Sequence, residues 1–151
     1  MNVTARADYA VRALLVLATS GPDLVKADTV ASAQDIPRHF LDNILGDLRR
    51  AGLVATQRGA EGGSRLARPA AEITIAHVMR AIEGPLAAVR DVRPEALAYA
   101  APAARLPDVW IAVRASLRSV LEHVTIADIA SGTLPTAVTA LTADPEAWRS
   151  H

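Results

Sequence analysis

The chain has 151 residues, of which 51% are apolar, 3% aromatic and 21% charged, with a formal net charge of +0 at pH 7. This length suits one domain with an appendage, and the alanine-rich, aromatic-poor composition favours packed helices over a β-sandwich. The lack of cysteine excludes disulfides, thiolate metal sites and thiol catalysis, and no apolar run reaches the roughly 18 residues of a membrane span, so we expect a cytoplasmic protein without membrane contact.

The first seventy residues predict a helix-turn-helix. An amphipathic first helix ends at "TSGPD", where Gly21 and Pro22 break it. A short second helix lies within residues 25–34, with Asp28 or Thr29 as its N-cap. Asp35 tolerates the left-handed conformation of a tight turn. A third helix over residues 37–50 follows, and its apolar stripe has helical spacing: Phe40, Leu41, Ile44, Leu45 and Leu48.

A glycine-bearing hairpin follows the third helix. The extended runs "LVATQR" and "SRLARP" flank "GAEGG", and a helix-turn-helix followed by a hairpin is a winged helix. Six arginines stand between positions 38 and 68 against Asp42, Asp47 and Glu61. This basic patch on a neutral chain suits nucleic acid, although a solvated charged face remains the alternative.

The glycine-rich loop does not predict an enzyme. It lacks the Lys-Ser/Thr pair that follows the glycines of a phosphate-binding loop, and it does not join a strand to a helix. No Ser–His–Asp set and no paired carboxylates can be assigned to a cleft. His77 and His123 each stand alone on a predicted helix, so we expect no metal site.

The second half of the chain predicts a connector and a dimerisation helix. Thr74 caps a helix that ends at Gly84, and residues 85–107 are rich in alanine and proline. A long helix then carries a stripe too broad for a lone surface helix, which indicates a homodimer: Trp110, Val113, Leu117, Val120, Leu121 and Val124. We divide the mainly α-helical chain into a winged helix (1–84), a connector (85–107), a dimerisation helix with a short terminal helix (108–134) and a flexible tail (135–151).

Five segments carry a resemblance to a known family: "ADYAVRALLVLA", "FLDNILGDLRRAGLV", "RGAEGGSRLARP", "EITIAHVMRAIEGPL" and "LEHVTIADI". In this order, the chain resembles the Rrf2 family of bacterial winged-helix transcription regulators, which includes iron–sulfur cluster regulators. The resemblance implies a homodimer on a pseudo-palindromic operator of double-stranded DNA, with the third helix in the major groove and the hairpin tip at the minor groove. It implies a sequence-specific regulator, which we expect to be a repressor.

The DNA-contacting residues follow from this resemblance and from side-chain chemistry. Arginine suits the negative potential of a narrow minor groove, while amide and carboxylate groups read base edges. The residues expected to contact DNA are Arg38, His39, Phe40, Asp42, Asn43, Arg49, Arg50, Arg58 and Arg65. The alternative is a protein-interaction or small-molecule-sensing module of the same fold that binds DNA weakly.

The chain departs from the family pattern in two places. In the wing, Glu61 brings a negative charge to the tip and Ser64 replaces a bulky aromatic residue. In the connector, the three cysteines with which cluster-binding relatives hold iron are absent, so we expect no cluster and no cofactor. Asp8, which matches an acidic cluster ligand of some relatives, is expected to pair with Arg12 instead.

Without the cysteines, three modes of control remain. The protein responds to a small molecule, responds to a partner protein, or acts constitutively. Met79, Tyr99 and Trp110 are candidates to line an apolar effector pocket. The alternative for Trp110 is core packing at the start of the dimerisation helix.

Overall fold

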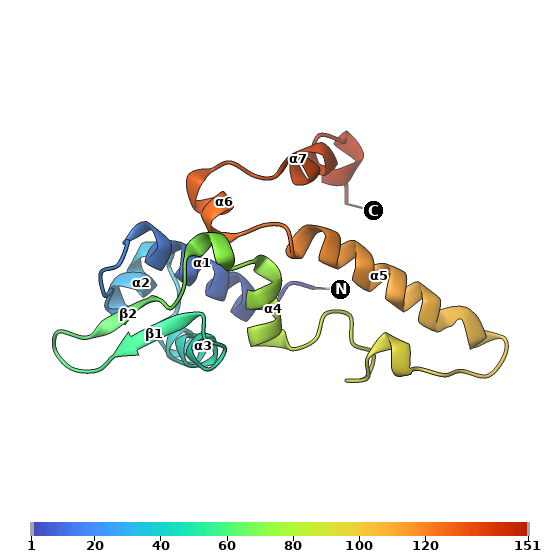
Figure 1. Cartoon of the computed structure of the whole chain (residues 1–151), viewed down its shortest axis with the longest axis horizontal. Coiled ribbons are helices and arrows are strands. Elements are labelled where there is room, and N and C mark those ends of the chain that lie inside the picture. The colour runs from blue at the N-terminus through green and yellow to red at the C-terminus, as the bar shows by residue number, and fades with distance from the viewer. Residues whose placement is uncertain (1, 151) are drawn as a thin grey trace.

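The structure is a computed structural model of the chain, and it describes residues 2–150. Seven α-helices and one two-stranded hairpin follow one another in these residues (Figure 1). Their bounds are α1 Ala5–Thr19, α2 Ala27–Gln34, α3 Arg38–Arg50, β1 Val54–Gln57, β2 Gly63–Leu66, α4 Ile75–Glu83, α5 Leu106–Leu121, α6 Ile126–Ser131 and α7 Thr136–Thr142.

The helix-turn-helix predicted from the sequence is confirmed in α2 and α3. Asp35 ends α2 in the left-handed region, with φ 50° and ψ 49°, which turns the chain sharply into α3. The predicted N-cap of α2 is wrong, because the helix begins two or three residues earlier than expected. Lys26 occupies the cap position without a side-chain hydrogen bond, and Asp28 lies inside the first turn, where its carboxylate faces Arg38 instead.

The predicted hairpin is confirmed as the antiparallel pair β1–β2, in which Val54 lies opposite Leu66 and Gln57 opposite Gly63. The end of β2 that is next to the loop is attached to the segment before α2. The backbones of Val25 and Ser64 exchange two hydrogen bonds of 2.8 Å, so a third extended segment adds to the hairpin. The wing is therefore joined to the helix-turn-helix by backbone pairing as well as by its chain connection.

Helix α1 lies at the centre of the core and packs against α2, α3, α4 and α6. Its inward side is mostly alanine, which allows neighbouring helices to approach closely: Ala7, Ala10, Ala13, Leu14 and Leu17 are buried. The predicted cap of α4 is confirmed, since the Thr74 side chain accepts from the backbone N–H of His77. The sequence analysis places the short terminal helix in one segment with the dimerisation helix. In the structure this helix, α6, packs against the core of the winged helix and buries Ile126.

Helix α5 extends away from the winged helix toward the far end of the molecule, with the connector running beside it (Figure 1). It ends at Leu121, so the predicted inclusion of Val124 is wrong: Val124 lies in the extended link to α6 and is 6% exposed. Its carbonyl accepts a hydrogen bond from the N–H of Ile75.

The sequence predicts a flexible tail from residue 135, whereas the structure has α7 over Thr136–Thr142. No helix within residues 2–150 meets the length and apolarity of a membrane span.

Candidate nucleic-acid interface

The two faces of α3 have different chemistry. Leu41, Ile44, Leu45 and Leu48 are buried against the core. The side that faces solvent carries the polar residues predicted to contact DNA: Arg38, His39, Asp42, Asn43, Arg49 and Arg50 are all exposed. This division arises from apolar residues at three- and four-residue spacing, which places them on one side of a helix.

Phe40 does not belong to the buried stripe in which the sequence spacing placed it. It is 37% exposed and lies at the edge of that stripe. Its ring is 4.4 Å from the ring of His39 and 5.9 Å from that of Tyr9, measured between centroids. The result is a small aromatic patch at the start of α3, beside the polar face.

At the start of α3, Arg38 connects both helices of the helix-turn-helix. Its Nε donates to a carboxylate oxygen of Asp28 at 2.8 Å, and a second guanidinium nitrogen donates to Asp42. These bonds, first to Asp42 and then to Asp28, raise the pKa of Arg38 above its ordinary value. Two carboxylates thus hold this guanidinium in a fixed position and offset its positive charge.

Further along α3, Asp47 accepts from two arginines. Arg6 of α1 donates at 2.5 Å, and Arg50 of α3 donates as well. Arg6 is a part of this surface that sequence reasoning missed, because it lies in another helix and its pairing with Asp47 leaves no local pattern. Arg49, in contrast, has no ion-pair partner among residues 2–150.

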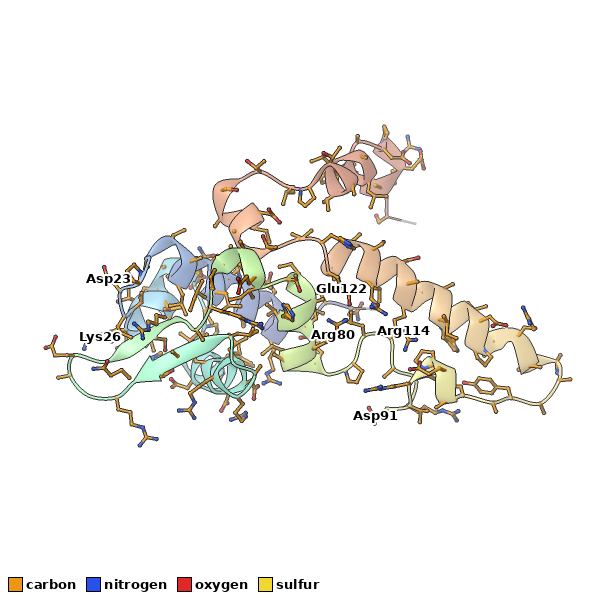
Figure 2. All side chains as sticks on the ribbon, viewed as in Figure 1. Asp23, Lys26, Arg80, Asp91, Arg114 and Glu122 are labelled. Atoms are coloured by element: carbon orange, nitrogen blue, oxygen red, sulfur yellow. The ribbon has the colours of Figure 1, made fainter. Side chains whose placement is uncertain are left out.

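The wing presents arginines without carboxylate partners. Arg58 and Arg65 are exposed, and within the described part of the chain neither forms an ion pair with Glu61 or Glu72. Lys26 Nζ donates to the backbone carbonyl of Ala60 at the hairpin tip, which adds a cation that the sequence did not reveal; Figure 2 shows Lys26 beside the hairpin. Cations in this arrangement suit phosphate oxygens and the minor groove.

Ser64 has a structural reason to be small. It is 4% exposed, and its hydroxyl lies 3.3 Å from the hydroxyl of Thr56 on the opposite strand. The adjacent Gly63 lies so close to Val25 that a Cβ built on it would be 2.7 Å from the Val25 carbonyl oxygen. The start of β2, next to the loop, therefore accommodates only small side chains.

Of the three residues predicted to line an effector pocket, only one lines the apolar groove that the structure contains. Met79 lines an apolar groove of about 490 Å³ between α1, α4 and α5, together with Leu117 and Leu121. Tyr99 and Trp110 are half-buried and do not line this groove.

His77 caps α4, since its Nδ1 accepts from the backbone N–H of Thr74 at 3.1 Å.

The remaining predicted dimerisation residues lie on α5, where Trp110, Val113, Leu117, Val120 and Leu121 are half-buried. No side chain of α5, which the structure describes in full, is buried. Val109 and Ile111 are more accessible, at 52% and 38%, and were missed because they fall outside the strict stripe. The apolar surface of α5 thus remains largely uncovered within one protomer.

Comparison with known proteins gives consistent matches along the chain. The sequence model of the Rrf2 family, described as an iron-dependent transcriptional regulator, matches residues 3–132. Rv1287 of Mycobacterium tuberculosis, which is named as an HTH-type transcriptional regulator, is 52% identical over 99% of this chain and 94% of its own. The HTH-type transcriptional regulator CymR of Bacillus subtilis is 32% identical over 88% of this chain and 92% of its own.

Solved structures agree with these matches. The structure of CymR, the global cysteine regulator of B. subtilis, covers 88% of this chain and 98% of its own with a TM-score of 0.72 and 30% identity. The structure of T. potens IscR matches 100% of this chain and 93% of its own, with a TM-score of 0.67 and 28% identity. These relatives are regulators and not enzymes.

The iron named in the family description does not fit the residues of this chain. The sequence has no cysteine, and residues 2–150 contain no cluster of three or more His, Asp or Glu side chains placed to hold a metal ion. The connector instead borders a cavity lined by Arg80, Arg93, Arg114 and Arg118, whose positive charges disfavour a cation.

The polar face of α3, the wing arginines and the long helix α5 are the parts by which a winged-helix regulator of this kind is recognised. They occur here in one chain together with a family match over most of its length and a 52% identical relative. The chain belongs to the Rrf2 family of DNA-binding transcriptional regulators.

Proposed function

We propose that the protein is a homodimer that represses transcription by binding a pseudo-palindromic operator, without an iron–sulfur cluster, in the cytoplasm. Each protomer inserts α3 into the major groove and places the tip of its wing at the adjacent minor groove. Because a two-fold dimer presents this surface twice, the two half-sites are related by the same symmetry, about one helical turn or a multiple of it apart.

The observation that carries the proposal is the exposed cationic surface formed by α3 and the hairpin. Arg49, Arg58 and Arg65 have no ion-pair partner among residues 2–150, so phosphate contact breaks no existing pair. The wing that carries Arg58 is held near its loop by the Val25–Ser64 pairing. A surface fixed in this way loses little conformational entropy when it binds DNA.

The uncovered apolar surface of α5 supports the homodimer. Val109 and Ile111 remain exposed on a helix that has no buried side chain of its own. Exposed apolar surface of this kind marks an interaction site, and a second copy of α5 covers it symmetrically.

The test is a gel-shift titration of purified protein against promoter fragments of its genome at several salt concentrations. We expect one or more fragments to bind specifically, with log affinity falling by roughly 0.9 per neutralised phosphate for each unit of log salt. Arg58→Ala reduces affinity and lowers this slope by about one per contact, and therefore by about two in a dimer.

The control is Arg149→Ala, which removes a charge near the C-terminus, where Arg149 pairs with Glu146. It is expected to leave operator affinity unchanged. Binding that is weak, insensitive to salt and equal for all fragments would contradict operator recognition and would favour a protein-interaction module of the same fold.

A further inference from the structure

A basic cavity lies at the junction of α4, α5 and the connector. It has a volume of about 440 Å³, which is within the range of small-molecule sites. Four arginines line it: Arg80 from α4, Arg93 from the connector, and Arg114 and Arg118 from α5. Figure 2 shows Arg80, Arg114 and Glu122 in this region between α4 and α5, away from Lys26 and the wing.

The positive charge of the cavity is only partly offset. Arg114 donates to Glu95 at 2.6 Å, while Arg80 and Arg118 donate to the same oxygen of Glu122, the latter at 2.9 Å. Two carboxylates therefore face four guanidinium groups. Arg93 has no ion-pair partner within residues 2–150.

The carboxylate of Glu122 is shared by two arginines and does not saturate their hydrogen-bond donors. A single oxygen of Glu122 accepts from both Arg80 and Arg118, so their remaining N–H donors are available to a second acceptor. The side chain of Arg114 is 23% exposed, whereas those of Arg80 and Arg118 are 41% and 52% exposed and accessible to a ligand. Guanidinium groups in such positions favour planar or tetrahedral oxyanions, to which they donate in pairs.

The rest of the lining is Glu95, which pairs with Arg114, and an apolar part formed mainly by Pro85, Leu86 and Ala88, behind which Pro94 is fully buried. An inorganic ion would leave this part of the wall without contacts, whereas a ligand with a short carbon skeleton covers it.

From this combination we propose that the cavity binds a small organic anion, a carboxylate or a phosphate ester, through Arg93, Arg118 and Arg80. The anionic group lies between these guanidinium groups, and its carbon skeleton lies against Pro85 and Leu86. The ligand and Glu122 compete for the same donors.

Such competition has a structural consequence. The Arg80–Glu122 contact joins α4 of the winged helix to the end of α5. An anion that takes the place of Glu122 removes this contact and changes how α5 is held against the winged helix. Its effect on operator affinity rests on the proposed function, whereas the binding site itself does not.

The experiment is isothermal titration calorimetry of the DNA-free protein with citrate and with glycerol 3-phosphate, at constant ionic strength. Sodium chloride and glycerol serve as controls for charge alone and for the uncharged skeleton. We expect at least one anion to bind with a Kd of about 1 mM or lower. Arg93→Gln is expected to weaken this binding roughly tenfold, which corresponds to the loss of one charge-assisted contact.

Two further variants make the result decisive. Glu122→Gln removes the competing carboxylate and is expected to tighten anion binding several-fold, a gain that a folding defect cannot produce. The matched control is Arg105→Gln. The side chain of Arg105 is 90% exposed and pairs with Asp108, and its replacement is expected to leave anion binding unchanged. The proposal is overturned if neither anion binds to the unaltered protein. It is also overturned if Arg93→Gln binds the anion as tightly as the unaltered protein and the Arg105→Gln control do. Because no DNA is present, failure here leaves operator binding untouched.

Discussion

Val25 and Ser64 exchange two backbone hydrogen bonds of 2.8 Å, which join the segment before α2 to the second strand of the wing. The contact is close because Gly63 has no side chain: a Cβ there would lie 2.7 Å from the Val25 carbonyl oxygen. The wing is therefore oriented by the same segment that leads into the helix-turn-helix.

This contact predicts the effect of Gly63→Val. The new side chain meets the Val25 backbone, which cannot move aside cheaply, so the two hydrogen bonds break or lengthen. We expect a loss of about 1–3 kcal/mol in the free energy of unfolding, measured by urea denaturation, and weaker operator binding. Ala67→Val adds similar bulk at an exposed position and is the control. Unfolding midpoints that match in the two variants would show that the contact does not hold the wing.

The charge at the wing tip gives a second prediction. Glu61 is exposed in the loop between Arg58 and Arg65, and its carboxylate repels nearby phosphates. Glu61→Gln is therefore expected to raise operator affinity a few-fold, by about 0.5–1 kcal/mol at low salt and by less at high salt. Gel shifts at two salt concentrations measure this, with Glu146→Gln near the C-terminus as the control. An unchanged affinity at low salt would place the wing tip away from the phosphates.

Local sequence signals were sufficient for the winged helix itself. Apolar spacing identified α3, an aspartate at position 35 marked the turn, and glycines between two extended runs marked the hairpin. Contacts between distant segments left no such pattern. The pairing of Arg6 with Asp47 and that of Arg80 with Glu122 depend on tertiary packing, and they determine much of the electrostatics of both candidate sites.

The errors in the sequence prediction have similar causes. Asp28 has the right chemistry for an N-cap, but in the fold its carboxylate pairs with Arg38. Val124 continues the apolar spacing of α5, yet the chain leaves the helix at Leu121 and pairs with the segment before α4. In both cases a tertiary contact overrides a local preference.

The shared carboxylate of Asp47 gives a third prediction. Its side chain is 20% exposed and lies between Arg6 and Arg50. Asp47→Asn leaves two arginines without their partner, so we expect a loss of about 0.5–1 kcal/mol in unfolding free energy, a modest value because both arginines are well solvated. Non-specific DNA affinity should rise at the same time, because the interface gains positive charge.

Urea denaturation and salt-dependent gel shifts measure these two effects. Asp23→Asn is the matched control, because Asp23 is exposed and has no ion pair among residues 2–150. A fall in DNA affinity with Asp47→Asn would mean that the carboxylate orients the two arginines for binding rather than offsetting their charge.

His77 gives a pH-dependent prediction. Partial burial lowers its pKa below the ordinary value, and repulsion from Arg68 and Arg80 adds to the effect. Since the unfolded chain binds the proton more readily, this contribution to stability is complete above the unfolded pKa of about 6.5 and is lost as pH falls through the lower folded value. Protonation also removes the Nδ1 acceptor that caps α4.

We therefore expect the melting temperature to fall between about pH 7.5 and about pH 5.5, and to fall less in His77→Gln. Differential scanning calorimetry at both pH values measures the difference. His123→Gln, at an exposed position, should keep the pH response of the unaltered protein. If the response persists in His77→Gln, another group causes it.

The last prediction concerns the uncovered side of α5. Val109 is 52% exposed in one protomer, so a substitution there disturbs little of the chain's own packing. Val109→Glu places a carboxylate where the second copy of α5 is expected to pack, and burying an unpaired charge costs several kcal/mol. The variant should be monomeric by light scattering, with unchanged helix content by circular dichroism, and should lose affinity for a full operator far more than for a half-site. Ala115→Glu adds the same charge on another side of α5 and should remain dimeric. If Val109→Glu stays dimeric while Ala115→Glu dissociates, α5 is still the dimerisation helix but pairs through the side that carries Ala115. If both remain dimeric, the subunits associate through another surface, and the spacing of the two α3 helices is set elsewhere.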